Sequence, residues 1–440
     1  MTDLLERTGA LVKKAKSLGT DEVIVKTTFG RRMQIRFSNN EVDISKIWNN
    51  YLTDVALTWN KRVVATEIRN FERAEERVED LFKLAKVSQP NPMYGGIAGG
   101  TFAYGKSKAD GKISTLEEPT AYVEQAIEAA RAEVPTGLNT GGTLYANYED
   151  VYLVSSEGPT GRDARSSIEL SIRAFSQKQA SGHGVECSSS LKDFDPSRAG
   201  RKAGEIAWLA KDPVAGEEGT YDVIFDPLIT GSMLGTYAMM ASAFFVMIQM
   251  SVFGNKLGEK VASEIVTLRD SPASYSVANR LFDDEGVPAR ETVIIDRGVL
   301  KSYLHNTSTA KIFKAETSGN AGLVVPEAWN VELDPGGLSR EEIFGEVRRG
   351  LYLTNTWYTR FQNYAVGDFS SIPRDGAFVL ENGEIKGSIK DIRISDNVLR
   401  MLGGMAAISR ERQHIHWWES QYPTLSPYIL IKDVKITRPK

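Results

Sequence analysis

One segment limits the folds open to this chain more than any other, because no residue from Pro227 to Asn255 carries a charge. An uncharged apolar stretch longer than about 18 residues is the usual signal of a membrane-spanning helix. Here Ser232, Thr236 and Gln249 dilute the apolar character, and no aromatic belt or basic flank accompanies the segment. We therefore predict one buried helix over residues 229–253 of a water-soluble protein.

The length and composition indicate a globular protein with more than one domain. A chain of 440 residues exceeds what one core organises, and 41% hydrophobic with 25% charged residues is a globular composition. The break around Pro213, Gly216 and Gly219 is the best boundary. The pattern favours the α+β class. It predicts an N-terminal domain (1–212) with a strand meander and helices, followed by a strand-rich C-terminal domain (220–440) that contains the buried helix.

Alternation and turn residues predict the individual elements. In the N-terminal domain, strands are expected at 22–29, 31–38, 42–47, 51–58, 151–155 and 167–175, and helices at 71–86, 121–133 and 199–211. In the C-terminal domain, strands are expected at 264–268, 292–295, 299–304, 376–380, 389–394 and 428–434.

Charge and cysteine content exclude some classes of partner and compartment. The net charge of −4 argues against nucleic acid as the main partner. Cys187 is the only cysteine, so no internal disulfide can form and a reducing compartment is favoured. The first 19 residues show the pattern of an amphipathic helix without the apolar core of a secretory signal. We expect a cytoplasmic protein that binds neither nucleic acid nor a membrane.

Gly100 to Ser107 matches the phosphate-loop pattern G-x-x-x-x-G-K-S. That motif requires a strand before the loop and a helix that begins at the Lys-Ser pair. The preceding residues 89–99 are rich in proline and glycine, and the following residues 108–111 form a turn signal. The context therefore argues against nucleotide binding.

The four histidines do not form a recognisable metal motif. No two have the i, i+4 spacing by which zinc peptidases place two imidazoles on one helix face. His414 and His416 flank one residue and would share a strand face, with Glu419 nearby, so a weak metal site is an alternative to amphipathic interface residues. His183 and Cys187 fall in a Gly/Ser-rich stretch, 181–190, which predicts a loop. No G-x-S-x-G elbow is present.

A series of short motifs occurs in the second half: 251–253 (SVF), 258–259 (GE), 261–264 (VASE), 282–288 (FDDEGVP), 294–304 (IIDRGVLKSYL), 317–321 (TSGNA), 367–370 (GDFS), 381–384 (ENGE) and 426–427 (SP). The stretch 282–304 predicts an acidic turn and then a hairpin reversed at Arg297-Gly298. Together, in this order, the motifs resemble the TldD/PmbA family. The resemblance covers the second half and, more weakly, the N-terminal meander.

Within that resemblance, TldD-like members carry H-E-x-x-x-H on a helix before the Ser-Val-Phe segment, and a cysteine near the C-terminus. Counting back from Ser251, the motif positions hold Leu234, Gly235 and Met239. These side chains provide neither zinc ligands nor a general base. The late cysteine is also missing. The chain therefore resembles the PmbA branch, also called TldE.

The resemblance implies a metal-free, pseudoenzyme-like subunit of a metallopeptidase that acts on unfolded or leader peptides. It would pair with a TldD-like subunit as a heterodimer, or with itself as a homodimer, and zinc is expected in the partner, with no cofactor in this chain. Gly319, Asn320 and Asn355 are candidates to line a groove for an extended peptide, the alternative being ordinary turn chemistry.

Two other functions remain open at this point. One is a stand-alone regulatory or binding protein of the gyrase-modulator type. The other is an autonomous metallopeptidase with an unorthodox site built from His414, His416 and Glu419. The sequence does not give the physiological peptide, or whether a side chain of this subunit assists catalysis.

Overall fold

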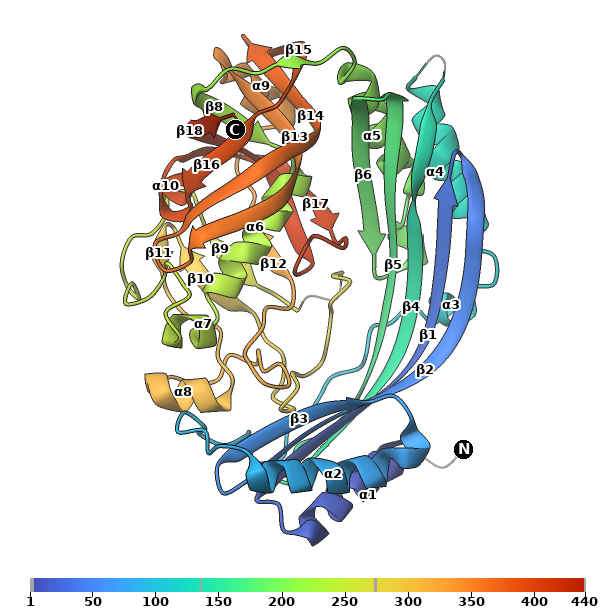
Figure 1. Ribbon diagram of the computed structural model, residues 1–440, viewed down its shortest axis with the longest axis vertical. Coiled ribbons are helices and arrows are strands. Elements are labelled where there is room, and N and C mark those ends of the chain that lie inside the picture. Colours follow the sequence, from blue (N-terminus) through green and yellow to red (C-terminus); the bar gives the residue numbers. More distant parts are fainter. Residues whose placement is uncertain (1–3, 135–136, 273–274, 439–440) are drawn as a thin grey trace.

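The computed structural model describes residues 4–134, 137–272 and 275–438. A six-stranded antiparallel sheet forms the N-terminal half, in the order β3-β2-β1-β4-β5-β6. In Figure 1 it is a long curved wall, with helices on its outer face and the C-terminal half opposite its inner face. Its strands are β1 (Glu22–Ser38), β2 (Glu41–Trp59), β3 (Arg62–Ile68), β4 (Asn139–Ser155), β5 (Thr160–Gln177) and β6 (Ala180–Ser188).

Helices cover the outer face of this sheet because alternate strand residues there are apolar. The helical segments of this half are α1 (Leu4–Leu18), η1 (Phe71–Arg73), α2 (Ala74–Val87), α3 (Gly111–Ser114), α4 (Thr120–Ala132), η2 (Leu191–Asp193) and α5 (Pro196–Leu209). Met33, Ile35 and Phe37 of β1 share a core with α3, α4 and α5, and Val23 and Val25 share a core with α1 and α2.

The C-terminal half is built on a mixed sheet, which confirms the α+β class with a strand-rich second half. Its strands are β7 (Val214–Ala215), β8 (Gly219–Phe225), β9 (Leu268–Asp270), β10 (Thr292–Asp296), β11 (Val299–Leu300), β12 (Val331–Leu333), β13 (Arg349–Asn363), β14 (Asp368–Glu381), β15 (Glu384–Lys390), β16 (Arg393–Asn397), β17 (Met405–Ile415) and β18 (Thr424–Thr437). Its helices are α6 (Pro227–Met240), α7 (Ala243–Met247), α8 (Thr307–Phe313), α9 (Arg340–Gly345) and α10 (Val398–Gly403).

The uncharged segment forms two helices, so the prediction of one helix over 229–253 is wrong. Asp226 caps α6 by accepting a hydrogen bond from the Leu228 amide (3.2 Å), and Pro227 occupies the first turn. The helix stops before Ser242, because the backbone around it pairs with Leu304 and the Ser242 hydroxyl donates to the Pro326 carbonyl (2.8 Å).

The two helices of the uncharged segment also differ in how deeply they are buried. Most of α6 is buried, whereas α7 is largely half-buried and Ile248 and Met250 lie at the surface. Among the described residues, no helix has the length and apolar character needed to cross a bilayer. The apolar run is explained by the core that α6 joins.

Several other boundaries differ from the prediction. Strand β1 runs unbroken through Gly30, and β2 runs unbroken through Asn49-Asn50, because the two strands pair with each other from Glu22–Thr58 to Ser38–Glu41. Residues 181–190 are mostly strand β6, not a loop. The strand expected at 264–268 lies at 268–270 instead, and the one expected at 389–394 is divided at Asp391, which has a positive φ of 58°.

Two local predictions are confirmed. Strands β10 and β11 form the predicted hairpin, with Asp296 opposite Val299 across Arg297-Gly298. After the phosphate-loop pattern, no helix begins at Lys106-Ser107; the next one, α3, starts only at Gly111. The segment 100–107 therefore lacks the helix N-terminus that a phosphate-binding loop uses.

The acidic turn of the second half docks on the sheet of the first half. Lys26 of β1 pairs with Asp284 (2.6 Å) and with Asp54 of β2 (3.2 Å). The Tyr104 hydroxyl donates to the Gly286 carbonyl (2.5 Å). Buried Asp283 accepts three backbone hydrogen bonds, but burial and Glu285 still raise its pKa to about 8. These contacts hold the two halves facing each other.

Candidate functional site

A cleft of about 530 Å³ lies between the inner face of the six-stranded sheet and the segment that follows β17. Because the strands are in register, its sheet residues form rows: Gln34 of β1 lies opposite Tyr145 of β4, which lies opposite Glu169 of β5. The lining residues are Gln34, Arg36, Thr143, Tyr145, Glu169, Leu170, Ser171, His416, Trp417, Trp418 and Ser420. We call this space the inner cleft.

His416 pairs with Glu169 across the inner cleft through its Nδ1 atom. Burial lowers the pKa of His416, but the hydrogen bond and negative charge of Glu169 outweigh it, so that this pKa is raised above its ordinary value. The pair therefore neutralises the carboxylate that faces the cleft. His416 also lines an adjoining cavity of about 320 Å³, which extends the cleft along the sheet to Arg32, Glu149 and Arg280.

The candidate metal residues do not gather. His414 lines a separate cavity of about 680 Å³ with Cys187 and Tyr275, while His416 faces the inner cleft. Strand β17 ends at Ile415, so the predicted shared strand face of the two histidines is wrong. Burial raises the pKa of Glu419 to about 7, against the opposing charge of Arg173. In the described part of the chain, no three His, Cys, Asp or Glu side chains form a group that could hold a metal ion.

A serine–histidine pair opens on the inner cleft but lacks the geometry of an activated nucleophile. The Ser171 hydroxyl lies 2.8 Å from Nε2 of His183, and the Asn355 amide nitrogen lies 3.0 Å from Nδ1. The Asn355 oxygen accepts from the Thr356 amide (2.8 Å), so its nitrogen faces the imidazole and donates. Burial and Arg173 lower the pKa of His183 to about 3. Neutral His183 thus carries its proton on Nε2 and cannot take one from Ser171.

The family metal-motif positions all lie on α6. Leu234 is buried, Gly235 is buried, and Met239 packs against the main core. A Cβ atom on Gly235 would meet nothing closer than the Tyr422 backbone nitrogen at 3.7 Å. The helix face with Gly231 and Gly235 thus looks toward residues 415–424, the segment that also forms one wall of the inner cleft.

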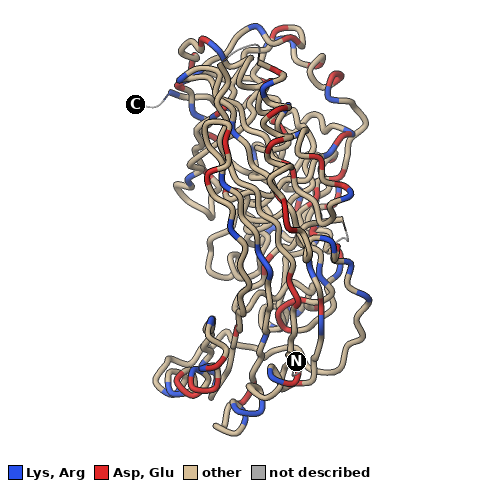
Figure 2. Tube along the Cα trace, turned by 90° about the vertical axis from the view of Figure 1, so that its right-hand side faces the viewer, with Lys and Arg blue, Asp and Glu red and all other residues tan. Residues whose placement is uncertain are grey.

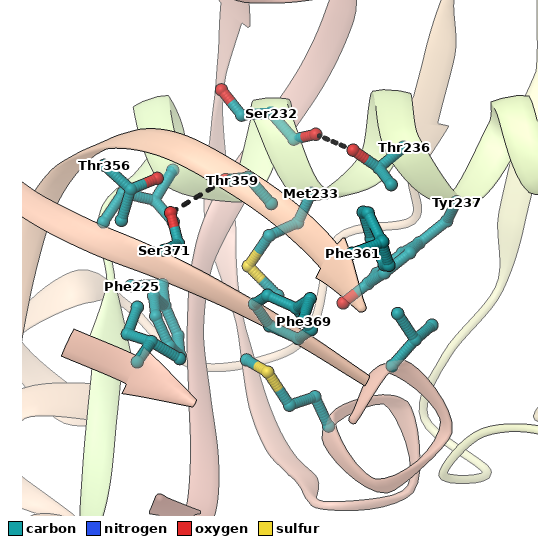
Figure 3. Close-up of a pocket in the computed structure, with 14 residues that line it drawn as sticks. Phe225, Ser232, Met233, Thr236, Tyr237, Thr356, Thr359, Phe361, Phe369 and Ser371 are labelled. Carbon is teal, nitrogen blue, oxygen red and sulfur yellow. Dashed lines mark hydrogen bonds between the residues drawn. The ribbon is translucent and has the colours of Figure 1, made fainter. Parts of the chain in front are cut away.

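The opposite face of α6 borders a small apolar pocket (Figure 3). Met233 and Tyr237 of α6 face Phe361 of β13 and Phe369 of β14 across it. Its volume of about 30 Å³ admits one water at most. The Thr236 hydroxyl bonds back to the Ser232 carbonyl (3.0 Å), which leaves only weak polarity there. This face serves packing.

The three residues expected to line a peptide groove lie inside the fold. The Asn320 amide donates to Asp270 (2.6 Å) and to the Glu327 carbonyl (2.8 Å), and the Asn355 amide donates to Asp375 (2.9 Å) as well as His183. Gly319 has a positive φ of 73°, and its carbonyl accepts from the Trp329 indole. None of them lines the inner cleft, and their role in binding a peptide stays a prediction.

Three of the four histidines are held neutral by burial. The pKa is lowered to about 3 for His183, and to about 4 for His305 and for His414, where Arg412 adds to the effect. An unfolded histidine titrates near 6.5. As the pH falls below that value, the unfolded chain binds protons that the native chain does not, so stability falls between about pH 6.5 and pH 4.

Replacing His305 with phenylalanine should make this acid sensitivity smaller. His305 is buried beside Tyr303 and Phe313, and among the described residues its Nδ1 has a hydrogen-bonding contact only with the Thr309 hydroxyl (3.2 Å), so an aromatic ring can take its place. Below pH 6.5 the free energy of unfolding should lose about 1.4 kcal/mol less per pH unit than in the wild type. Urea unfolding at pH 7, 6 and 5 measures the slope.

The control is His416→Gln. The stability that His416 contributes is present below pH 6.5 and is lost as the pH rises through its raised folded pKa. This control should therefore leave the slope between pH 6 and pH 5 unchanged. An unchanged slope in His305→Phe would show that native His305 is already protonated in this range.

The sequence did not single out Arg36 and Trp418 as site residues. Alternation on β1 marks Arg36 as a residue of the face opposite Met33 and Ile35, but not what lies across from it. The exposed fraction of Trp418 is 73%, which no local pattern signals. Only the approach of residues 416–420 to the sheet makes them neighbours.

Comparison with protein families matches two models of one family. Residues 218–438 match the PmbA/TldA metallopeptidase C-terminal domain, and residues 112–209 match its central domain. A metalloprotease of Methanothermobacter thermautotrophicus is 32% identical over 227 residues, which cover 50% of each chain. A metalloprotease TldD homolog of Buchnera aphidicola subsp. Schizaphis graminum is 25% identical over 339 residues, which cover 69% of this chain and 70% of that one. The first of these relatives is thus matched over about half its length.

Solved structures share the whole fold. TldE from Thermococcus kodakarensis superposes with a TM-score of 0.86 at 23% identity, covering 98% of this chain and 100% of that chain. A Thermotoga maritima protein described as a candidate modulator of a DNA gyrase gives 0.85 at 23% identity, covering 98% and 99%. At this identity the likeness concerns the fold. The family models span more than half of the chain, and the chain therefore belongs to the TldD/PmbA family of metallopeptidase-related proteins.

Proposed function

We propose that the chain is the metal-free subunit of a TldD/PmbA-type metallopeptidase complex that cleaves unfolded or leader peptides. The observation that carries this proposal is the set of side chains on α6. Leu234, Gly235 and Met239 occupy the positions that match the family's metal motif, and they pack as core residues. A thioether, an alkyl chain and a hydrogen atom provide neither hard ligands nor a base for zinc.

The residues of this chain therefore do not fit the zinc that the family implies, and we place that zinc in a TldD-like partner subunit. What this chain supplies is a shaped surface. The inner cleft and its adjoining cavity run along a wall of paired strands, which suits a peptide in extended form. Holding such a peptide across the partner's metal would orient the scissile bond and exclude folded chains. The single cysteine favours the reducing cytoplasm for the complex.

The proposal predicts that cleavage requires both subunits. The purified chain, a TldD-like subunit from the same host and their equimolar mixture are each incubated with an unstructured peptide that carries a fluorophore and a quencher. Only the mixture should give turnover, at least about tenfold above either subunit, because the surface that holds the peptide and the metal that cleaves it lie on different subunits. Size-exclusion chromatography of the mixture should show a heterodimer.

Metal removal provides a readout that does not depend on activity. Treating the isolated chain with EDTA should leave its melting temperature unchanged, since no metal contributes to its stability. The same treatment should abolish turnover by the mixture. The proposal fails if the TldD-like subunit alone matches the mixture, if this chain alone cleaves the peptide, or if elemental analysis finds about one zinc per isolated chain.

A further inference from the structure

Within the described part of the chain, the inner face of the six-stranded sheet carries two cations without partners. Arg36 of β1 lines the inner cleft, and Lys46 of β2 lies opposite Gln34, another cleft residue. Arg36 itself lies opposite Ile44, so Arg36 and Lys46 are diagonal neighbours on one face of the sheet. Both are exposed, and within the described ranges neither makes a hydrogen bond or an ion pair.

The carboxylates that line the inner cleft and its adjoining cavity are already neutralised. Glu169 pairs with His416, and Glu149 pairs with Arg32 at 2.8 Å. Among the residues that line the inner cleft, the charge left over is therefore that of Arg36, although the chain as a whole has a net charge of −4. A cleft whose lining carboxylates are paired, next to two cations without partners among the described residues, suits a ligand that brings its own carboxylate.

An aromatic surface lies beside these cations. The exposed fraction of Trp418 is 73%, even though one of its edges contacts Trp357 and Trp417, with ring centroids 6.1 and 5.5 Å away. Trp418 lines the same cleft as Arg36. Trp48 of β2, with an exposed fraction of 37%, continues the sheet face beyond Arg32. Aromatic rings of this kind bind peptide backbone and apolar side chains with little sequence preference.

We propose that the inner cleft selects extended peptides with an acidic residue or a terminal carboxylate, which Arg36 and Lys46 bind while Trp418 packs against the neighbouring peptide segment. The inference deepens the proposed function and rests on it only in taking a peptide as the ligand. Arg36 forms the bidentate contact, because a guanidinium matches the geometry of a carboxylate. Lys46 adds attraction at the entrance.

The charge pattern favours a peptide over a nucleic acid. A polyphosphate chain needs a continuous basic track, whereas Glu169 and Glu149 interrupt the face in rows to one side of the row that holds Arg36. In Figure 2, acidic and basic residues are interspersed along the trace. Arg36 and Lys46 together can pair with one or two carboxylates of a peptide.

Binding to the isolated chain tests the inference without any partner subunit. Three labelled, unstructured peptides of one length differ only at two positions, which hold Glu, Gln or Lys, and fluorescence anisotropy gives each Kd. The C-terminus is amidated in one set and free in another, so that side-chain and terminal carboxylates are distinguished. We expect the Glu peptide to bind about tenfold more tightly than the Gln peptide, and the difference to shrink with added salt.

Arg36→Gln should remove most of this preference, and Lys46→Gln part of it, without loss of fold because both side chains are exposed. Trp418→Ala should weaken all three peptides alike. The matched control is Arg69→Gln, an equal change of charge on a side chain 85% exposed, directly after the end of β3.

Equal Kd values for the Glu and Gln peptides, an Arg36→Gln variant that keeps the preference, or tighter binding of a single-stranded oligonucleotide than of the Glu peptide would each overturn the inference. These results do not depend on catalysis. If the preference holds but mixing subunits gives no turnover, it is the proposed function that fails.

Discussion

Replacing Lys202 with methionine should destabilise the protein by about 3–5 kcal/mol, because it leaves a buried carboxylate without its counter-charge. The Lys202 ammonium lies 2.6 Å from Asp226 and donates to the hydroxyls of Tyr352 (3.1 Å) and Tyr428 (3.0 Å). Burial acts to lower the pKa of Lys202, but Asp226 outweighs it, so this pKa stands well above its ordinary value. Urea unfolding at pH 7 gives the free-energy change.

The pair matters for the candidate site because Asp226 is the N-cap of α6. The Asp226 oxygen that does not cap the helix contacts Lys202 and also accepts a hydrogen bond from Tyr352 (2.6 Å). The start of α6 is therefore tied to α5 through Lys202 and to β13 through Tyr352. The control is the double variant Lys202→Met with Asp226→Asn, which removes both charges and keeps the cap acceptor. It should recover at least half of the loss. A single variant as stable as the wild type would show that Asp226 is not ionised in the native state.

Replacing Gly184 with alanine should destabilise the protein by about 2–3 kcal/mol through overpacking. A Cβ atom at this position of β6 would lie 2.0 Å from the Ala199 carbonyl oxygen of α5. Gly182, two residues earlier, faces Ala203 in the same way at 2.1 Å. Backbone atoms cannot rotate aside as a side chain can, so α5 must move away from the sheet. The shift would also strain the Lys202–Asp226 pair.

The comparison for this variant is Gly9→Ala in α1. No atom lies within 4 Å of the position its Cβ would take, so the change should stabilise the helix by about 0.5–1 kcal/mol. Thermal and urea unfolding of both variants measure the contrast. A Gly184→Ala protein as stable as the wild type would mean that α5 is not held against β6 as closely as the structure places it.

The sequence by itself determined the elements whose signals are local. The reversal between β10 and β11 at Arg297-Gly298 depends on neighbouring residues alone, because this residue pair adopts positive φ. The start of α6 also has a local signal in Asp226-Pro227, a cap acceptor followed by a ring that fits the first turn, although the predicted helix begins two residues later, at Ile229. The order of the motifs in the second half also sufficed to indicate the family, and the pattern of strands and helices sufficed to indicate the α+β class.

Only the tertiary structure decided the elements whose reason lies elsewhere in the chain. Residues 181–190 suggest a loop because glycine and serine are common there, yet residues 181–188 belong to strand β6, since Gly182 and Gly184 are small enough to let α5 lie on the sheet. The uncharged run divides into two helices at Ser242, because the backbone groups of the residues on either side of Ser242 form hydrogen bonds with Leu304.

The candidate site depends on the same kind of distant contact. Arg36, Glu169 and His416 lie far apart in the sequence and share a cleft only because β1 and β5 curve over the segment after β17. Strand alternation tells which face each side chain takes, but not what covers that face. That is decided by how the two halves dock, through contacts such as Lys26 with Asp284, and no local pattern of residues encodes such a pairing.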